Sequence, residues 1–416
     1  MRDFLPADKA KREAVISKIR AGYAAHGFEE IETPVMESLE RLHSGMGGDN
    51  EKLSYAIMKR GLKDTELADA AKSGNALALA DLGLRYDLTV PLARFYATNQ
   101  AALPRVFRAI QIAPVWRAER PQKGRFRQFV QCDIDVLGEG SISAEAELII
   151  AALDVFDSLG LKDFSIRIND RRLLSELLTS FGFDKDHQDD ALITIDKQDK
   201  IGIEGVLKEL AERGHSEEAI AGFKAFATRP MTMIYHPFGE AQIKHRLGPD
   251  FESEAITDLA AIGKAVAASS RDSERLTFDP FLVRGMGYYT GTIFEVYHPE
   301  LGYSLGGGGR YDKMIGRFSG SEVPAVGFSI GFERILDLLD DDASNSLKKL
   351  LLLDEGVVAE KLLSVKSKLM NDGFAVSVQP KPKNLNHTLE LAKTNGFTSW
   401  AIVSTAGELS EVRELA

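Results

Sequence analysis

The most constraining feature of the chain is a charged, hairpin-like stretch at residues 115–138, VWRAERPQKGRFRQFVQCDIDVLG. An apolar start, a turn-prone basic loop and an alternating segment with Gln131, Asp133 and Asp135 predict two antiparallel strands joined by a loop. Five basic residues fall within eleven positions: Arg117, Arg120, Lys123, Arg125 and Arg127. Guanidinium groups bind phosphate oxygens through paired hydrogen bonds, so the hairpin can hold a polyanion. A solvated hairpin with a charged turn is the alternative interpretation.

A second segment, LVRGMGYYTGTIFE at 282–295, joins an arginine to a tyrosine pair and a glutamate. Read alone, it is a strand interrupted by glycines with half-buried tyrosines. Further along, LGYSLGGGGRYDKM at 301–314 contains four consecutive glycines. Glycine permits close backbone approach to a ligand, although such a run is also typical of a flexible turn.

Together these segments resemble the class II aminoacyl-tRNA synthetases, and specifically the histidyl-tRNA synthetase family. Arg117 and Glu119 match the Arg-x-Glu of motif 2, and residues 131–138 resemble its archaeal and eukaryotic version. The signature of the histidine enzymes is matched by Arg284, Gly285, Tyr288, Tyr289, Thr292, Phe294 and Glu295. Gly287 departs from it, because the family usually has aspartate there.

Other parts of the chain extend the resemblance. A helix predicted to begin at Pro6 and end near Gly27, followed by the strand FEEIETP, resembles motif 1, which builds the dimer interface in the family. Residues 81–95 resemble the segment that contacts the amino acid, and 325–336, AVGFSIGFERIL, resemble motif 3. The resemblance therefore implies a homodimer.

The resemblance assigns roles to residues of this sequence. Arg117 and Arg284 are the expected catalytic residues, and Arg117, Glu119 and Arg334 are expected to bind ATP. The positions expected to bind histidine are Asp87, Thr89, Gln131, Asp135, Arg284, Tyr288 and Tyr289. The tip of the basic hairpin is expected to contact tRNA through Arg120, Gln122, Lys123 and Arg125.

The implied reaction has two steps. The carboxylate of L-histidine attacks the α-phosphorus of ATP, and the resulting adenylate passes its histidyl group to the 3′ end of tRNA(His). Two anions meet in the first step, so positioning and fixed positive charge are the main demands. Mg²⁺ is expected to bridge the phosphates, bound partly through water. No cysteine–histidine cluster has the spacing of a metal site made by side chains alone.

We expect an α+β catalytic domain with a mostly antiparallel sheet, a helical insertion and a small C-terminal α/β domain. Residues 1–163 and 272–338 would form the catalytic domain, and 164–271 the insertion. Strand–helix alternation after the polar linker at 340–346 predicts a parallel α/β unit at 347–416. That unit resembles the family's anticodon-binding domain in shortened form.

Composition excludes several classes of protein. No run approaches the roughly 18 apolar residues that cross a bilayer, so no membrane partner is expected. Cys132 is the only cysteine, which fits a cytoplasmic location. The net charge of −11 argues against indiscriminate nucleic-acid binding but allows a tRNA that meets local basic patches.

Two alternatives to a ligase remain. One is a non-catalytic paralogue resembling the histidine-sensing regulatory subunit of ATP phosphoribosyltransferase. The other is an RNA-binding module without synthetase chemistry, which gives no reason for the histidine signature.

Overall fold

The hairpin predicted from residues 115–138 is present as two paired strands, β5 (Phe107–Trp116) and β6 (Gln128–Leu137), which are antiparallel over their full length. The computed structural model describes residues 1–46, 53–120, 124–229, 238–269, 273–284, 288–301, 303–339 and 348–415. Lys18–Leu339 belong to a larger compact unit, and the C-terminal sheet belongs to a smaller one.

Among the described residues, eight strands form the central sheet of the larger unit, in the order β1-β5-β6-β11-β10-β9-β7-β8. The β1–β5 and β7–β8 pairs are parallel and the other five are antiparallel. The remaining bounds are β1 Glu29–Glu30, β7 Ser165–Asp170, β8 Leu276–Phe278, β9 Thr292–Tyr297, β10 Gly306–Arg310 and β11 Ala325–Gly331. The expectation of a mostly antiparallel sheet is confirmed.

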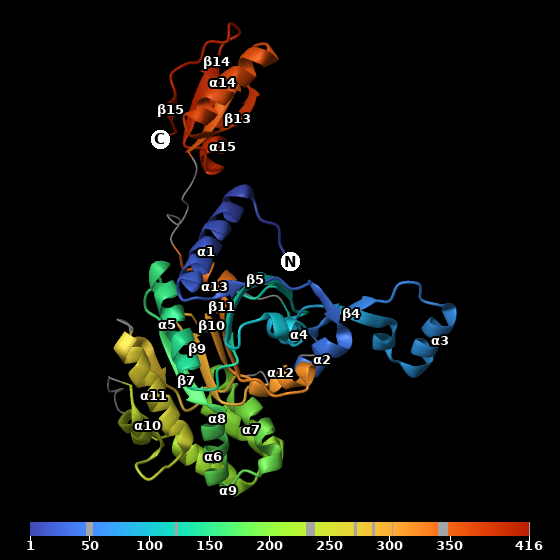
Figure 1. Cartoon of the computed structure of the whole chain (residues 1–416), viewed down its shortest axis with the longest axis vertical. Helices are drawn as coiled ribbons and strands as arrows, with labels where there is room; N and C mark the ends of the chain where they lie inside the picture. The colour runs from blue at the N-terminus through green and yellow to red at the C-terminus, as the bar shows by residue number, and fades with distance from the viewer. Residues whose placement is uncertain are drawn as a thin grey trace. The chain divides into compact units, whose positions relative to one another are not determined.

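Strand β6 shows how the sequence divides the two faces of this sheet. Cys132, Ile134 and Val136 are fully buried, whereas the alternating positions carry polar side chains that line a cavity on the other face. Helix α5 (Ser143–Ser158) packs on the apolar face, where Phe156 lies edge-on to Phe328 of β11 with ring centroids 6.2 Å apart. Figure 1 shows α5 running along the sheet.

The four consecutive glycines form strand β10 and not a turn. They pair with β9 on one side and β11 on the other. A Cβ atom on Gly308 would lie 1.9 Å from the carbonyl oxygen of Gly327, so only glycine fits the observed approach of β10 to β11. Close backbone packing, and not flexibility, explains the run.

Several elements surround the sheet. Strands β2 (Met36–Ser38), β4 (Ala80–Leu84) and β3 (Tyr55–Met58) form a three-stranded antiparallel sheet in that order. The helical elements described outside the interval 164–271 and before residue 340 are α1 Pro6–Ala25, α2 Leu39–Met46, α3 Asp64–Ser73, η2 Ala76–Leu79, α4 Thr89–Asn99, η3 Gln100–Ala102, α12 Asp312–Ser319 and α13 Phe332–Leu336.

The interval 164–271 begins with β7, which pairs with β9 and β8 inside the central sheet. Helices follow it: α6 Arg171–Phe181, η4 Lys185–His187, α7 Gln188–Ile195, α8 Gln198–Glu212, α9 Glu217–Ala227, α10 Glu240–Leu247, α11 Glu254–Ser269 and then η5 Ser273–Arg275. The N-cap aspartate of α6, Asp170, accepts a hydrogen bond from the backbone N–H of Arg172. Because β7 pairs with β8 and β9, the first element of the interval is part of the large sheet.

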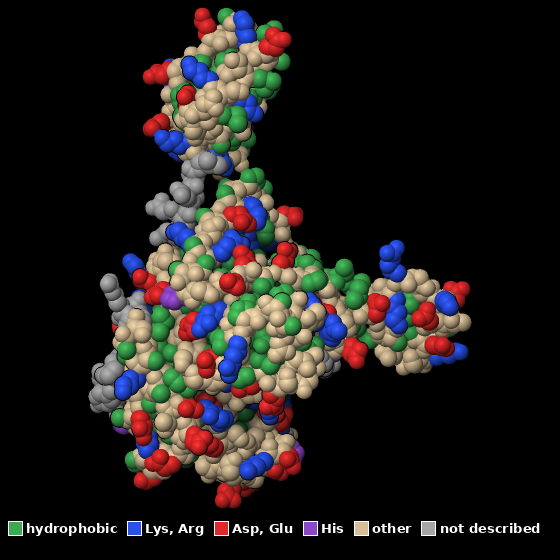
Figure 2. All heavy atoms as spheres, viewed as in Figure 1, with side chains coloured by type: hydrophobic (Ala, Val, Ile, Leu, Met, Phe, Trp, Pro, Cys, Tyr) green, Lys and Arg blue, Asp and Glu red, His purple; other side chains and the backbone are tan. Residues whose placement is uncertain are grey.

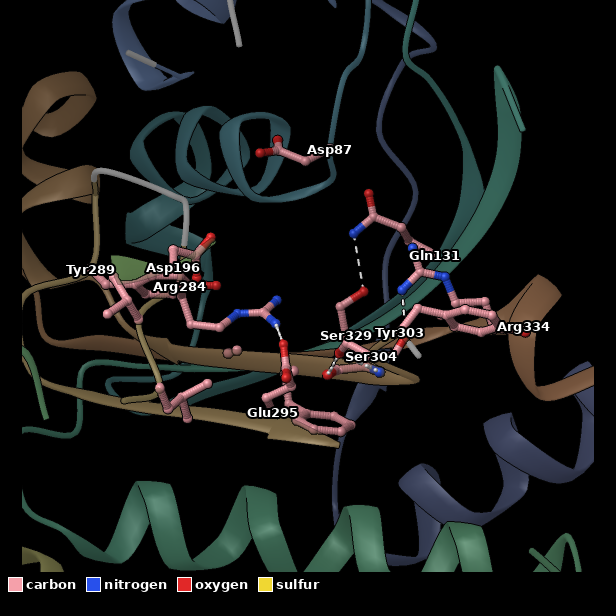
Figure 3. Close-up of a pocket in the computed structure, with 18 of the residues that line it drawn as sticks. Asp87, Gln131, Asp196, Arg284, Tyr289, Glu295, Tyr303, Ser304, Ser329 and Arg334 are labelled. Atoms are coloured by element: carbon pink, nitrogen blue, oxygen red, sulfur yellow. Dashed lines mark hydrogen bonds and ion pairs between the residues drawn. The ribbon is translucent and has the colours of Figure 1, made fainter. Parts of the chain in front are cut away.

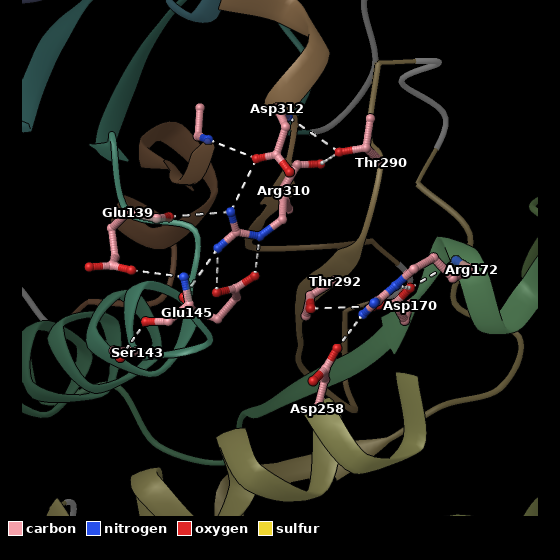
Figure 4. A network of polar contacts seen from close by, with 12 residues as sticks. Glu139, Ser143, Glu145, Asp170, Arg172, Asp258, Thr290, Thr292, Arg310 and Asp312 are labelled. Carbon is pink, nitrogen blue, oxygen red and sulfur yellow. Dashed lines mark hydrogen bonds and ion pairs between the residues drawn. The ribbon is translucent and has the colours of Figure 1, made fainter. Parts of the chain in front are cut away.

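Two ionic networks among the described residues connect these elements, one buried around Arg310 and one partly exposed around Arg172 (Figure 4). Arg310 of β10 donates to both carboxylate oxygens of Glu145 on α5, at 2.6 and 2.7 Å. Arg172 joins Asp170 to Asp258 of α11, with distances of 2.9 and 2.8 Å. These pairs link the strands to the helices that cover them.

The C-terminal sheet has the order β13-β12-β14-β15. Its elements are β12 Lys348–Asp354, α14 Ala359–Asn371, β13 Phe374–Pro380, α15 Leu385–Thr394, β14 Ser399–Val403 and β15 Arg413–Glu414. Strand β12 is parallel to β13 and β14, as strand–helix alternation predicts, and β15 is antiparallel to β14. The predicted α/β fold is confirmed.

Candidate active site

A cavity of about 480 Å³ lies over the polar face of the central sheet. Its walls come from segments far apart in the sequence, including β6, β9, β10 and β11 (Figure 3). The predicted site residues that line it are Asp87, Thr89, Arg117, Glu119, Arg125, Gln131, Asp135, Arg284, Tyr288, Tyr289 and Arg334. Arg120 is exposed and outside the cavity wall. Gln122, Lys123, Gly285 and Gly287 lie outside the described residues.

Aromatic rings and backbone oxygens hold Arg117 at one end of the cavity. Its Nε donates to the backbone oxygen of Tyr86 at 3.1 Å. Its guanidinium carbon lies 4.3 Å from the ring centroid of Tyr86 and 5.1 Å from that of Phe129. Stacking of this kind orients the guanidinium group while leaving it charged.

Arg334 occupies the same region. It donates hydrogen bonds to the backbone oxygens of Ser304 and Gly124, and its guanidinium carbon is 5.3 Å from the ring centroid of Tyr303. Burial lowers the pKa of Arg334 from its ordinary value. The pKa of Arg334 is lowered further by repulsion from the guanidinium groups of Arg125, Arg117 and Arg284.

Two glutamates partly balance this charge. Glu295 of β9 accepts a hydrogen bond from Nη1 of Arg284 at 2.7 Å, and Glu119 pairs with Arg125 at 3.4 Å. Burial disfavours the charge on Arg284, but Glu295, Tyr289 and Asp196 together more than offset this, so the pKa of the arginine is raised. Four guanidinium groups thus gather in a partly buried space, which suits a ligand with several negative charges.

The other end of the cavity is acidic. Burial raises the pKa of Asp135 to about 7, and Asp87 adds to this, although the Tyr311 hydroxyl opposes it by donating to Oδ1 at 2.5 Å. Burial and the neighbouring Asp135 also raise the pKa of Asp133 well above its ordinary value. Since the described residues form no ion pair with these buried carboxylates, a cationic ligand would favour their charged forms.

Two oxygen atoms at this end have no hydrogen-bond partner within the part of the chain that the structure describes. They are Oδ2 of Asp87 and Oε1 of Gln131, and both are buried. The other oxygen of Asp87 accepts a bond from the backbone N–H of Val90 at 3.2 Å. Because an unpaired buried acceptor costs free energy, both atoms are suited to a ligand with N–H donors.

The tyrosine pair closes the acidic end. The rings of Tyr288 and Tyr289 pack edge-on with centroids 4.8 Å apart, and Tyr288 also lies 6.1 Å from Tyr311. Burial raises the pKa of Tyr288 well above its ordinary value, and a hydrogen bond with Thr89 opposes this. Burial also raises the pKa of Tyr289, so both hydroxyls stay protonated; Tyr288 bonds to Tyr289, whose own hydroxyl can donate to a ligand.

Sequence reasoning did not assign every residue of the cavity wall. The wall residues to which the sequence analysis gave no role include Tyr86, Tyr303, Ser304, Tyr311, Ser329 and Glu333. Tyr311 lies within the glycine-rich segment already singled out, so its neighbours in sequence gave a signal. Ser329 had none. The α7–α8 junction also reaches the cavity, through Asp196, Gln198 and Lys200.

No group of three or more histidine, cysteine or carboxylate ligands able to hold a metal ion occurs among the residues that the structure describes. Glu119, Glu295 and Glu333 are carboxylates that line the cavity near the arginine cluster. A cation at this end would therefore take most of its ligands from a bound phosphate and from water. None of the described helices has the length and apolar content that crossing a membrane would require.

Comparisons with known proteins agree with this geometry. The family model described as histidyl-tRNA synthetase matches residues 1–335. The histidine–tRNA ligase of Leifsonia xyli subsp. xyli is 52% identical over 405 residues, covering 97% of this chain and 94% of that protein. A probable histidine–tRNA ligase of Tropheryma whipplei is 42% identical over 410 residues, and the match covers 95% of this chain and 93% of that protein.

Solved structures show the same fold. The histidyl-tRNA synthetase of Nostoc sp. PCC 7120 superposes with a TM-score of 0.73 at 25% identity, covering 99% of this chain and 95% of that one. A protein of Bacillus halodurans C is described as an ATP phosphoribosyltransferase regulatory subunit/histidyl-tRNA synthetase. It superposes with a TM-score of 0.73 at 21% identity, and the match covers 97% of this chain and 96% of that one. The latter likeness concerns the fold alone.

Proposed function

The chain belongs to the histidyl-tRNA synthetase family, and from this membership we propose that it is a histidine–tRNA ligase whose active site is the cavity over the central sheet. The observation that carries the proposal is the division of that cavity into an arginine-rich end and an acidic end. ATP and histidine differ in the same way, since one brings phosphates and the other brings an ammonium group and an imidazole ring.

We propose that the arginine-rich end binds ATP. Arg117 would hold the α-phosphate, and Arg334 would hold the adenine and the outer phosphates. The charge that develops on the phosphorus oxygens would then meet guanidinium groups already fixed by stacking and hydrogen bonds, which lowers the barrier without a covalent protein intermediate. Mg²⁺ would neutralise the phosphates, and Glu119 and Glu333 are carboxylates in the cavity wall that could contribute ligands.

Histidine would bind at the acidic end. Its ammonium group would bond to the unpaired oxygens of Asp87 and Gln131, and its imidazole would meet Asp135 and the tyrosine pair. Arg284 would hold the histidine carboxylate or the α-phosphate, which places it at the reacting atoms. A site that hydrogen-bonds polar groups of its substrate rejects analogues that lack them far better than an apolar pocket can.

The domain roles are also proposals. The central sheet and the segments 1–163 and 272–338 would form the catalytic domain, the helices within 164–271 would contact the tRNA acceptor arm, and 347–416 would bind the anticodon. Arg120 and Arg125 would contact tRNA(His), together with Gln122 and Lys123. The archaeal and eukaryotic character of residues 131–138 stays a prediction, because the relatives compared above are bacterial.

We also propose a cytoplasmic homodimer. Motif 1 supports the dimer, and so do exposed apolar side chains on the small sheet; Figure 2 shows green side chains around the place of β4 in Figure 1. Met36 is 51% exposed and Met58 is 60% exposed, and burial against a second copy would remove both from water.

The test is histidine-dependent exchange of labelled pyrophosphate into ATP without tRNA, with all twenty amino acids assayed separately. Exchange with histidine alone is the expected result. A folded protein that binds histidine without exchange would instead be the regulatory paralogue. The cluster of Arg117, Arg284 and Arg334 in one cavity argues for the ligase, since a sensor of histidine needs no site for phosphates.

A further inference from the structure

The carboxamide of Gln131 is bonded at only one of its two ends within the described part of the protein. Its Nε2 donates to Oγ of Ser329 at 3.0 Å and lies 3.3 and 3.4 Å from the two oxygens of Asp133. Its Oε1 is buried and unpaired. In Figure 3 this oxygen points away from Ser329, toward the side of the cavity where Asp87 lies.

Ser329 alone does not decide which way the amide points. A hydroxyl both donates and accepts, so on its own it could bond to either end of the carboxamide, but here it also bonds to Asp133 and lowers the pKa of that carboxyl. An ionised carboxylate only accepts. While Asp133 is ionised, reversing the amide would bring Oε1 against its oxygens with no proton between them, so the ionised carboxylate excludes that orientation.

The register of the sheet keeps the three groups together. Asp133 of β6 lies directly opposite Ser329 of β11, and Gln131 is two residues along the same strand and so on the same face. Cys132 and Ile134, which alternate with them, are fully buried on the opposite face. A shift of one residue would exchange the two faces, so core packing fixes this arrangement.

We propose that Asp133 is a positioning residue, which fixes the carboxamide of Gln131 so that Oε1 faces the cavity as the acceptor for the ammonium group of histidine. The inference rests on the proposed function, because it concerns how the same site binds its amino acid. Asp133 acts through Gln131 and does not itself contact the ligand.

The charge state of Asp133 is consistent with this role once the ligand binds. Burial and Asp135 raise its pKa, whereas a hydrogen bond with Ser329 and the charge of Arg117 lower it. An arriving ammonium group adds a positive charge and so favours the ionised, acceptor-only form.

The test compares Asp133→Asn with Ser329→Ala by calorimetric titration, using histidine and 3-(imidazol-4-yl)propionate, which lacks the amine. Asparagine can present its NH₂ to Gln131 and so allows the reversed amide. We expect Asp133→Asn to bind histidine at least about tenfold more weakly than the wild-type protein, because the hydrogen bond to the charged ammonium group is lost. The same variant should bind the amine-free analogue almost as well as the wild-type protein does. Ser329→Ala should keep histidine affinity within about threefold, since Asp133 still sets the orientation.

A double variant separates positioning from a general loss of shape. In Asp133→Asn, the additional change Gln131→Glu should restore histidine binding, because a carboxylate offers an oxygen to the asparagine and another to the ammonium group. Gln131→Glu alone would place two carboxylates side by side and should bind histidine poorly. The double variant also provides a test if Asp133→Asn folds badly.

Three results would overturn the inference: wild-type histidine affinity in Asp133→Asn, equal losses for histidine and the amine-free analogue, or a Ser329→Ala variant as weak as Asp133→Asn. Failure of the wild-type protein itself to bind histidine would be a different result, because it would contradict the proposed function.

Discussion

Arg284 lies directly against the backbone of Gly307. A Cβ atom on that glycine would be 3.0 Å from Nη1 of Arg284 and 2.5 Å from the backbone oxygen of Phe294. The side chain of Arg284 thus crosses β10 at a point where the strand has no side chain, and reaches Glu295 on β9 at 2.7 Å. The glycine run makes room for the arginine that the histidine signature supplies.

Gly307→Ala should therefore impair activation. The added methyl group must displace Arg284 or separate β10 from β9, and we expect pyrophosphate exchange to fall by at least about tenfold with a lower melting temperature. Gly140→Ala is the matched control, because its Cβ would come no nearer than 3.4 Å to another atom. Full activity in Gly307→Ala would mean that the arginine need not occupy this position.

Arg284→Ala should lose adenylate formation by well over about tenfold while keeping its fold, because a group that stabilises the transition state is removed. Pyrophosphate exchange measures the loss, and circular dichroism checks the fold. Arg108→Ala breaks another arginine–glutamate pair, with Glu147, away from the cavity wall and should retain activity. Near-normal exchange by Arg284→Ala would show that this arginine is structural.

Asp135→Asn should change how stability depends on pH. The pKa of Asp135 is raised to about 7 from an ordinary value of 3.8, so the folded protein binds the proton more tightly than the unfolded chain does. Its contribution to stability is present below the ordinary value and is lost as pH rises through about 7. Without ligand, the variant should gain stability relative to wild type between about pH 4 and pH 8, as measured by urea unfolding. The prediction would be contradicted if the free energy of unfolding of the variant and that of the wild-type protein changed with pH in parallel.

Arg310→Ala should destabilise the larger unit by about 3–5 kcal/mol, because it leaves the buried carboxylate of Glu145 without its cation. Urea unfolding at neutral pH measures the change. Arg20→Ala, which breaks the exposed pair with Glu30, should cost only about 0–1 kcal/mol. A similar small cost at Arg310 would show that Glu145 finds another partner or takes up a proton.

The sequence by itself determined the local features of the site. The hairpin and the residues placed on it followed from alternation and charge, because a strand directs alternate side chains to opposite faces whatever its neighbours are. Sequence motifs likewise singled out Arg117, Arg284 and Arg334 before any contact between them was known, and the family followed from the same residues.

Only the tertiary structure decided which distant residues meet. Gln131 and Ser329 are separated by 198 positions, and their hydrogen bond exists because β6 and β11 are neighbours in one register. The glycine run has the local preferences of a turn, yet pairing on both sides makes it a strand, since backbone hydrogen bonds and close packing outweigh the preference. Contacts between strands depend on the order of the sheet, and no local pattern encodes that order.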